Sequence, residues 1–552
     1  MRSSLRVAVL LLAVVLELAA QPVHLMLPGK HGQLLENAAA IFTRRVKARC
    51  VAFSRRPVSI ELRVRPGLGA DGFRISDGPR GSIVVTGNEE RGVLYGLGKL
   101  FRNSRCESGA FVPGGWRGTS SPAGSLRGVY LASHFGNFYE AAPIEELETY
   151  VEDLALWGVN AVGFAFPVWQ YDSFDDPAAR RNLTRIIAMM KAAKRAGMQV
   201  GTFIVPNQAF RTAPAELHSK PYPDDWKRRG NLGTNLCPSL PAGHQYLLEI
   251  WARLLNEFRE TGLDFVTYWP YDEGGCGCDQ CWPWGSRGYA QLCRDFTKVA
   301  RMTYPNTKIV LSTWMFDSPP AGEWDGLTKL MKSERTWADY ILADAHEDFP
   351  RYPLDKGVPG GLPLVNFPEI SMWGMSPWGG YGANPLPLHA QTLWDQVAAK
   401  VSGGFPYSEG IYEDLNKVIY SQFYWDPKRT ALETMTEYVA SEFSPSVTGL
   451  VLRAVATMEA NHRRRNARFQ QPAQHTAEAL KLMRDADAKL TPQARGSWRW
   501  RILFLRALID DELSRNGPRL TPVLQAAFEE LVRIYHAEGV HTNRVAPPAL
   551  QP

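Results

Sequence analysis

A (β/α)8 TIM barrel of the α/β class is the fold that the sequence predicts, with a small N-terminal α+β domain before it and a C-terminal α-helical domain after it. Between residues 126 and 425, short apolar segments alternate with helical patterns until eight strands are counted. The 552 residues are too many for one ordinary domain and suit two or three. After residue 427 the apolar positions recur only at helical spacing.

The N-terminal α+β domain is expected over residues 21–115. Three of its segments alternate polar and apolar residues as half-buried strands do, with glycine turns between them, and two others have helical periodicity. The strands are expected over residues 59–66, 72–78 and 81–87, and the helices over 33–47 and 90–102. Residues 113–125 are rich in Gly, Ser and Pro and are expected to link this domain to the barrel.

The barrel is expected over residues 126–425, and each of its strands is bounded by turn residues. We expect the strands over residues 128–133, 159–166, 198–205, 265–268, 308–314, 338–345, 362–367 and 403–407. Helices are expected over 144–157, 178–196, 243–261, 286–303 and 388–400. In the C-terminal helical domain, residues 427–540, helices are expected over 432–443, 448–464, 475–490, 493–513 and 523–536.

Two adjacent carboxylates, Asp272 and Glu273, follow the fourth strand and are the candidate catalytic residues. Neighbouring carboxylates at the end of a buried strand repel each other and are costly to desolvate, so a fold rarely keeps them there without a task. Trp269 and Tyr271 bracket the pair, and carboxylates among aromatic residues are typical of a site that cleaves sugars. The alternative is a solvated loop acid beside an acid that opens a helix.

The active site of a barrel of this kind lies at the carboxyl ends of its strands, and the polar and aromatic residues near those ends are candidates for substrate binding. They are Arg127, His134, Trp269, Trp314, Asp344, Glu369, Trp373, Tyr407 and Glu409. Each has an ordinary alternative; Trp314, for example, could belong to the core. For Glu413, which also lies near the end of the eighth strand, the preferred interpretation is an acid that opens the helix after it. The convergence of so many candidates on one face of the barrel is what predicts a site.

Seven cysteines divide into a pair, a cluster and a single residue. Cys50 and Cys106 flank the same N-terminal unit and are a plausible disulfide in an exported protein. The spacing Cys276-x-Cys278-x-x-Cys281, with Cys237 as the fourth ligand, suits either a structural zinc site or two disulfides. A catalytic metal is disfavoured, because four thiolates leave no open coordination position. Cys293 lies in a helical pattern and is expected to be a buried thiol.

Compartment and partners follow from the first twenty residues and from the charge. A basic start, an apolar run and small residues before Gln21 predict a signal peptide over residues 1–20 and hence export to the periplasm or the exterior. No later segment has about 18 uninterrupted apolar residues, so no membrane anchor is expected. The net charge of +6 is small and scattered, which disfavours nucleic acid as a partner.

The motifs resemble those of the family 20 and family 84 β-N-acetylhexosaminidases over roughly residues 55–425. The helix RGVLYGLGKLFR looks like the one that closes the small domain of family 20, and LRGVYL looks like the first barrel strand, whose arginine binds sugar hydroxyls. Asp272-Glu273 is similar to the acid pair after strand four, although Trp-Pro-Tyr precedes it here in place of Gly-Gly. The cysteine loop is not part of that pattern, and the helical C-terminus is more like family 84 or the family 67 α-glucuronidases.

The resemblance implies substrate-assisted cleavage of a terminal β-linked N-acetylhexosamine from an oligosaccharide or glycoconjugate, with no cofactor for catalysis. Asp272 would hold the acetamido N–H, and Glu273 would act first as general acid and then as the base that activates water. The role of hydroxyl binder would fall to Arg127. Other strand-end residues could then wall the sugar or accept its hydroxyl groups: Trp314, Trp373 and Tyr407 as walls, and Glu409 as acceptor.

Two other functions remain open. An α-glucuronidase-like enzyme would keep Glu273 as acid and take its base from Glu369 or Asp344, with about 6.5–9.5 Å between the carboxyl groups if it inverts. It would also need cations for the uronate, for which the strand ends offer Arg127 and His134. A carbohydrate-binding protein without activity would present stacking aromatic residues without a correctly placed acid.

Overall fold

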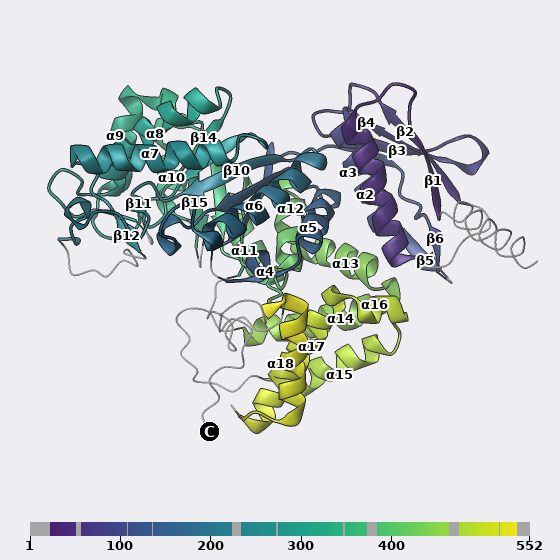
Figure 1. Cartoon of the computed structure of the whole chain (residues 1–552). Helices are drawn as coiled ribbons and strands as arrows, with labels where there is room; N and C mark the ends of the chain where they lie inside the picture. The colour runs from purple at the N-terminus through teal and green to yellow at the C-terminus, as the bar shows by residue number, and fades with distance from the viewer. Residues whose placement is uncertain are drawn as a thin grey trace, which may run out of the picture.

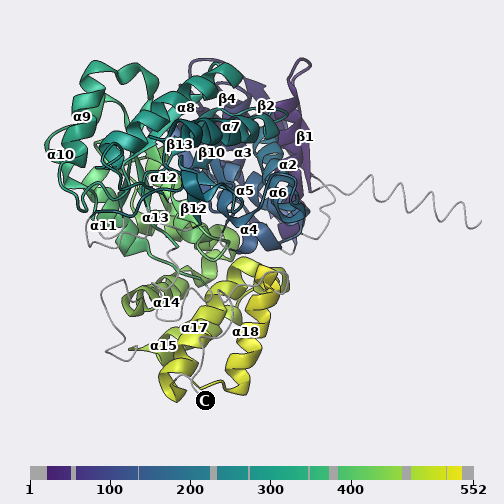
Figure 2. The same cartoon turned by 60° about the vertical axis from the view of Figure 1, so that its left-hand side comes forward.

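The computed structural model describes residues 22–50, 57–107, 109–134, 136–223, 233–271, 274–345, 348–371, 383–462, 474–517 and 519–537. Three groups of elements are visible in it: an N-terminal sheet with two helices, a central barrel, and a set of C-terminal helices (Figure 1). Turned by 60°, the same view shows the C-terminal helices α14, α15, α17 and α18 gathered on one side of the barrel (Figure 2). The predicted signal peptide lies outside the described residues.

The N-terminal part is a five-stranded sheet in the order β1-β2-β4-β3-β7, covered by two helices. The strands are β1 (Val23–Met26), β2 (Val58–Val64), β3 (Phe73–Asp77), β4 (Ile83–Gly87) and β7 (Gly118–Ser120), and the helices are α2 (Gln33–Arg49) and α3 (Glu90–Arg102). The predicted disulfide is confirmed: Cys50 after α2 is bonded to Cys106 in β5 (Arg105–Glu107), which pairs with β6 (Ala110–Val112). Strand β1 was not predicted, because four residues are too few to show an alternation.

Helix α3 packs closely against the barrel because a glycine lies at the contact. A Cβ atom at Gly98 would overlap the backbone carbonyl of Leu156, the last residue of barrel helix α5 (Ile144–Leu156). The buried side of helix α3 includes Val93, Leu94 and Leu97. The sequence therefore uses small residues on one face of this helix to let two backbones approach.

Eight parallel strands close into the predicted barrel. Their order around it is β8 (Leu126–Leu131), β9 (Ala161–Ala165), β10 (Gln199–Ile204), β13 (Phe265–Tyr268), β14 (Lys308–Ser312), β15 (Tyr340–Ala345), β16 (Leu364–Pro368) and β17 (Val401–Gly404). Closure comes from the pairing of Gly403 with Leu126 and of Gly404 with Arg127. The eighth strand is broken before β18 (Tyr407–Ser408), which also pairs with β8. The TIM-barrel fold is thus confirmed.

Helices surround the barrel in the predicted places, and α4, α9 and α10 are additions that the sequence did not predict. They are α4 (Phe138–Ala141), α5, α6 (Pro177–Arg195), α7 (Pro241–Glu257), α8 (Ala290–Thr303), α9 (Glu323–Ser333), α10 (Arg351–Asp355), α11 (Pro387–Val397) and α12 (Asp414–Trp425), and a short pair, β11 (Gln208–Ala209) and β12 (Thr234–Asn235), lies before α7. Helix α9 was not predicted. Its interior Gly326 lowers its helix propensity, but the glycine allows close packing against Ser286.

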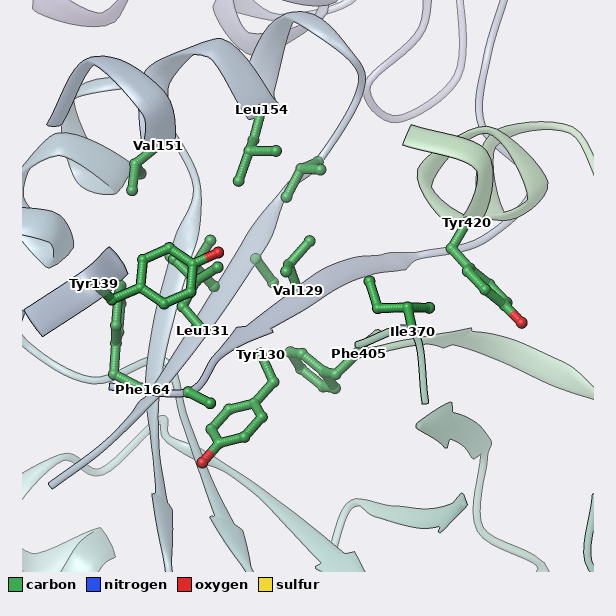
Figure 3. Packing of buried hydrophobic residues seen from close by; sticks show 14 of the residues in the cluster. Val129, Tyr130, Leu131, Tyr139, Val151, Leu154, Phe164, Ile370, Phe405 and Tyr420 are labelled. Carbon is green, nitrogen blue, oxygen red and sulfur yellow. The ribbon is translucent and has the colours of Figure 1, made fainter. Parts of the chain in front are cut away.

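The core of the barrel wall follows the two-residue period of the strands. Val151 and Leu154 of α5 point toward the strand that carries Val129 and Leu131, whereas Tyr130 points away from that helix (Figure 3). All of these side chains are buried. Side chains at odd-numbered residues of β8 therefore pack against the outer helices, and side chains at even-numbered residues face the barrel interior.

Six helices lie in the described residues of the C-terminal part. They are α13 (Ala431–Glu442), α14 (Thr448–Asn461), α15 (Thr476–Asp487), α16 (Pro492–Gly496), α17 (Trp498–Asn516) and α18 (Pro522–Tyr535). Helix α13 begins with a capping box, in which the Thr430 side chain accepts the N–H of Glu433 and the Glu433 carboxylate accepts the N–H of Thr430. The predicted helix 493–513 is divided at Ser497 into α16 and α17.

A buried group of charges joins the three parts of the chain. Arg45 of α2 lies 3.1 Å from Glu442 of α13 and 3.4 Å from Asp153 of α5. Arg499 of α17 lies 2.9 Å from Asp414 of α12 and 3.6 Å from Asp153. Burial alone would raise the pKa of Glu442, but the surrounding arginines outweigh it and hold that pKa at about 2. These ion pairs fix how the flanking helices meet the barrel.

Candidate active site

Six aromatic rings lie together at the carboxyl ends of the barrel strands. We call them the carboxyl-end rings: Tyr130, Phe203, Trp269, Trp314, Phe367 and Tyr407. The ring centroids of Trp269 lie 5.0 Å from Trp314 and 4.7 Å from Phe367, and Tyr130 lies 4.2 Å from Phe203. These residues come from or directly follow six different strands, so they form a floor across the barrel. Such a floor offers apolar faces on which a sugar ring can stack.

Carboxylates border this floor on one side. Glu409 follows β18, is 3% exposed, and accepts hydrogen bonds from the hydroxyl groups of Tyr407 and Tyr412, at 2.5 and 3.4 Å. Glu369 follows β16, is also buried, and forms a β-bridge with Tyr407. Burial first, and then the charges of Glu409 and Glu369, raise the pKa of the Tyr407 phenol well above its ordinary value. Asp344 lies half-buried on the neighbouring β15.

Glu413 holds the backbone of the loop that carries Glu409. It is the N-cap residue of α12, as its predicted place before a helix requires, but its carboxylate does not cap that helix. One of its oxygens accepts the backbone N–H groups of Glu409 and Gly410, at 2.6 and 3.2 Å. Burial raises the pKa of Glu413 to about 7, against the opposing charge of Lys417. Glu413 therefore fixes the backbone that presents Glu409.

Lys417 is a buried cation whose charge acts on the Glu413 carboxylate. Its Nζ donates to the hydroxyl of Tyr139 at 3.0 Å and to that of Ser408 at 2.8 Å, and also to the carbonyl of Gly410. Burial lowers its pKa to about 8, although Glu413 raises it. Lys417 and Glu413 thus both hold the loop after β18 through hydrogen bonds to its backbone.

Three predicted site residues, Asp272, Glu273 and Trp373, lie outside the described residues. The residue before the acid pair is described and is firmly anchored. Tyr271 is fully buried, and its hydroxyl donates to Glu323 of α9. The carbonyl of Pro270 accepts the indole N–H of Trp284 at 2.6 Å.

The residues after the acid pair are anchored as well. The side-chain oxygen of Asn207 accepts the N–H of Gly275 at 3.0 Å, and its amide nitrogen donates to the Gly275 carbonyl at 2.9 Å. The hydroxyl of Tyr222 donates to the carbonyl of Gly274 at 2.6 Å. The backbone on both sides of Asp272 and Glu273 is therefore tied to the carboxyl end of the barrel.

His134 lies where the sequence predicts it, just after β8. Its Nδ1 is 3.3 Å from the hydroxyl of Tyr130, and the two ring centroids are 6.1 Å apart. Its carbonyl accepts the side-chain N–H of Gln170 at 2.6 Å. His134 therefore borders the carboxyl-end rings.

The position of Arg127 corrects the expectation that it binds sugar hydroxyls. It is the second residue of β8 and so lies at the amino end of the strand, where it is fully buried. Its guanidinium donates to Asp71 at 2.7 Å, to the carbonyl of Gly158 at 2.7 Å and to that of Gly124 at 2.9 Å. Its donors hold the N-terminal part against the barrel and are remote from the strand ends.

The sequence reasoning missed Tyr130, Phe203 and Phe367, because inside a strand they cannot be told from core residues. Strand register was the available signal. Each lies at the last or next-to-last position of its strand, where an inward-facing side chain reaches the carboxyl-end layer. Glu413 was read only as a helix opener, and its hydrogen bonds to the preceding loop have no sequence signature.

Four buried thiols lie together beside this site. The thiol cluster consists of Cys237, Cys276, Cys278 and Cys281, and its sulfur atoms all lie within 4.8 Å of one another. The sulfurs of Cys237 and Cys278 are 3.6 Å apart, and all four residues are free cysteines. Their chemistry and spacing allow them to bind a metal ion. Cys293, also free and buried, lies in α8 as predicted.

No protein-family model and no curated protein matches the chain. Solved structures do resemble it. A family GH115 4-O-methyl-alpha-glucuronidase with specificity for decorated arabinogalactans aligns over 93% of this chain and 76% of its own, at 12% identity and a TM-score of 0.60. The Clostridium perfringens GH89 enzyme, solved with GlcNAc-alpha-1,4-galactose, aligns over 91% and 64%, at 11% identity and a TM-score of 0.60.

A third similar structure is the Flavobacterium johnsoniae chitobiase of family GH20. It aligns over 93% of this chain and 93% of its own, at 14% identity and a TM-score of 0.52. All three neighbours are glycoside hydrolases, and they belong to three different families. Identities this low show a shared barrel with flanking parts and leave the substrate to be argued from the site.

Proposed function

We propose that the protein is a glycoside hydrolase that removes terminal β-linked N-acetylhexosamine from an oligosaccharide or glycoconjugate. The observation that carries the proposal is the floor of carboxyl-end rings bordered by Glu369 and Glu409. It lies at the end of the barrel to which the backbone flanking Asp272 and Glu273 is tied. Apolar faces for a sugar ring, acceptors for its hydroxyl groups and an acid pair are the parts that glycoside cleavage needs.

In the proposed reaction, the acetamido oxygen of the substrate attacks its own anomeric carbon. Asp272 accepts the acetamido N–H and stabilises the positive charge of the oxazolinium ion. Glu273 protonates the leaving glycosidic oxygen. As a carboxylate it then removes a proton from the water that attacks the anomeric carbon and opens the oxazolinium ring. The configuration at the anomeric carbon is retained, because two displacements occur in sequence.

The surrounding residues bind the sugar in this proposal. Trp269 and Trp314 form an apolar wall, with Trp373 and the ring of Tyr407 on its other sides. Glu409 accepts sugar hydroxyl groups, with Tyr407 and Tyr412 orienting its carboxylate. The other strand-end residues complete the set of polar contacts: His134, Asp344 and Glu369. A metal ion at the thiol cluster would be structural, so the chemistry needs no cofactor.

An α-glucuronidase-like reaction is the second candidate, because Glu369 offers a buried carboxylate on a strand end other than that of Glu273. It would act as the base while Glu273 acts as the acid. Arg127 no longer supports this candidate, since its guanidinium is bonded at the opposite end of the barrel and cannot hold a uronate. The acetamido reaction is therefore preferred.

Export is part of the proposal, with residues 1–20 as the signal. The Cys50–Cys106 disulfide supports it, because disulfides form and persist in oxidising compartments. In the described part of the chain, no helix combines the length and apolar character needed to cross a bilayer.

The test is hydrolysis of aryl β-N-acetylglucosaminide and β-N-acetylgalactosaminide by wild type, Asp272→Asn and Glu273→Gln. We expect wild-type turnover and a loss of roughly 10²- to 10⁴-fold in kcat for each variant. Asp279→Asn is the matched control, because this exposed acid lies in the same loop. Release of a uronic acid from glucuronides, without turnover of either acetamido sugar, would instead establish the second candidate.

A further inference from the structure

The thiol cluster joins two loops that lie far apart in the sequence. Cys237 precedes α7. The other three cysteines lie after β13, within a stretch of six residues from Cys276 to Cys281. All four side chains are buried. Buried thiols that converge from separate loops need a bond or a common ligand to explain their arrangement, because each is a poor hydrogen-bonding group.

The distances favour a common ligand over two disulfides. A disulfide requires sulfur atoms about 2.05 Å apart, whereas Cys237 and Cys278 are 3.6 Å apart. In a tetrahedral site with Zn–S bonds of about 2.3 Å, the sulfurs lie roughly 3.8 Å from one another. The same structure contains the bonded pair Cys50–Cys106, so bonded and separate cysteines are distinguished within one chain.

The surroundings of the sulfurs also suit thiolates. The Ser239 hydroxyl is 3.0 Å from the sulfur of Cys237 and 3.3 Å from that of Cys278, so it can donate to a ligand sulfur. The backbone N–H of Cys281 donates to the carbonyl of Cys278 at 3.0 Å, which forms the tight turn of a Cys-x-x-Cys ligand pair. Four sulfur ligands in tetrahedral reach select zinc or iron among the common metals.

The loop that contains Cys237 is hydrogen-bonded to Asn207, which anchors the backbone after Asp272 and Glu273. The N–H of Leu236 donates to the carbonyl of Asn207 at 2.8 Å, and the Asn207 side chain makes both hydrogen bonds to Gly275. Cys276 is the next residue, three positions after Glu273. An ion at the thiol cluster would therefore close a ring of contacts around the segment Gly274–Cys281.

We propose that the thiol cluster binds one zinc ion, and that this ion fixes Gly274–Cys281, the segment that directly follows Asp272 and Glu273. The ion takes no part in bond cleavage, because four thiolates fill its coordination shell. It acts on catalysis by position, since small displacements of a catalytic group cost large factors in rate. The effect of the ion on catalysis rests on the proposed glycoside hydrolysis, whereas the metal site does not.

The first experiment measures metal and thiols in the full chain, purified without added metal. We expect about one zinc per chain by elemental analysis, and five reactive thiols after denaturation with a chelator, which are the five free cysteines. Cys278→Ser should lose most of the zinc, whereas Cys293→Ala, which removes a buried thiol outside the cluster, should retain it. A single reactive thiol would mean two disulfides and would overturn the proposal, as would a stoichiometric iron content.

The second experiment tests the effect of the ion on the loop. Hydrogen exchange of peptides covering residues 274–285 should be fast in Cys278→Ser and slow in wild type and Cys293→Ala, while barrel-strand peptides remain protected in all three. Equal protection with and without zinc would overturn the positional role. If zinc and protection behave as expected but no glycoside is cleaved, the proposed function fails and the metal site stands.

A third measurement joins the two proposals. With an active enzyme, Cys278→Ser should lose roughly 10- to 100-fold in kcat, and Cys293→Ala should lose less than about twofold. Zinc restored to chelator-treated wild type should return both exchange protection and kcat. Full activity in the zinc-free protein would show that the ion does not position the acid segment.

Discussion

The two ends of the barrel treat buried charge in opposite ways. At the amino end, Arg127 and Arg91 bind the same carboxylate, Asp71, so each charge has a partner of opposite sign. At the carboxyl end, Glu409 accepts phenolic hydroxyl groups and Glu413 accepts backbone N–H groups. The first arrangement neutralises charge and joins two parts of the chain. The second holds carboxylates in defined positions among aromatic rings.

This difference supports the carboxyl end as the place of the proposed chemistry. Burial would raise the pKa of Asp71, but Arg127 and Arg91 outweigh it and lower that pKa, so the carboxylate stays ionised. Burial raises the pKa of Glu413 to about 7, within the range where a proton can be exchanged. Carboxyl groups with a pKa raised toward neutrality are enriched at functional sites, which agrees with the proposed site at the carboxyl end.

Loss of the arginine at the amino end should have the largest effect on stability. Arg127→Met removes the buried ion pair and leaves two carbonyl groups without their donor, so we expect a loss of about 3–5 kcal/mol in the free energy of unfolding. Denaturant unfolding measures it. Arg91→Met is the control, because Arg91 binds the same carboxylate but its side chain is 27% exposed, and it should cost less.

The KM of the same variant tests whether Arg127 binds the substrate or only stabilises the fold. The folded fraction of Arg127→Met should keep its KM for the aryl glycosides, since the guanidinium is bonded to Asp71 at the amino end. A variant of normal stability with a raised KM would restore the sugar-binding role that the sequence motif implied.

Glu413 should make stability depend on pH. Its pKa in the folded chain, about 7, lies above the ordinary value of 4.5, so the folded state holds this proton more tightly than the unfolded state. Its contribution to stability is therefore complete below pH 4.5 and is lost as the pH rises through about 7. At about 1.4 kcal/mol per pH unit, the loss is at most about 3.5 kcal/mol.

Glu413→Gln should remove this dependence. Unfolding of wild type and variant across pH 4 to 8 measures the difference between them. The titratable groups that interact electrostatically with Glu413 are Lys417, Tyr139 and Tyr535. Curves that stay parallel over this range would mean that folding does not raise the pKa of Glu413.

Glu409→Gln should affect activity more than stability. The amide keeps an acceptor for Tyr407 but loses the charge that strengthens hydrogen bonds to sugar hydroxyl groups, worth about 1.5–3 kcal/mol, hence roughly 10- to 150-fold in kcat/KM. The unfolding free energy should change by less than about 1 kcal/mol. Glu216→Gln, at an exposed carboxylate, is the control for charge. A large loss of stability with unchanged kcat/KM would make Glu409 a structural residue.

Most of the fold could be predicted because its signals are local. Alternating apolar segments and helical periods placed all eight strands, and the disulfide followed from two cysteines flanking one unit. Helix α9 was not predicted, because Gly326 lowers its intrinsic helix propensity and the helix is stabilised by tertiary packing. The break between β17 and β18 also escaped, because it depends on how the closing strand meets β8.

The site could be predicted only where a residue's place in its strand was unambiguous. Trp269 and Glu409 follow strands and were expected at the carboxyl end, where they lie. Arg127 was assigned by a motif, although counting from the start of its strand would have put it at the other end. Tyr130 lies inside its strand and differs from a core residue only by its next-to-last position there.

A smaller effect separates the floor of the site from ordinary core. Trp314→Phe and Trp324→Phe both shrink a buried indole, but Trp314 belongs to the carboxyl-end rings, whereas Trp324 in α9 stacks on Tyr352 at 5.2 Å. Both variants should lose about 1–2 kcal/mol of stability through the space they leave. Only Trp314→Phe should raise KM for the aryl glycosides, by about 3- to 10-fold, because it alone removes stacking surface from the sugar. Equal KM values in the two variants would mean that the ring of Trp314 serves the core and that the sugar binds elsewhere.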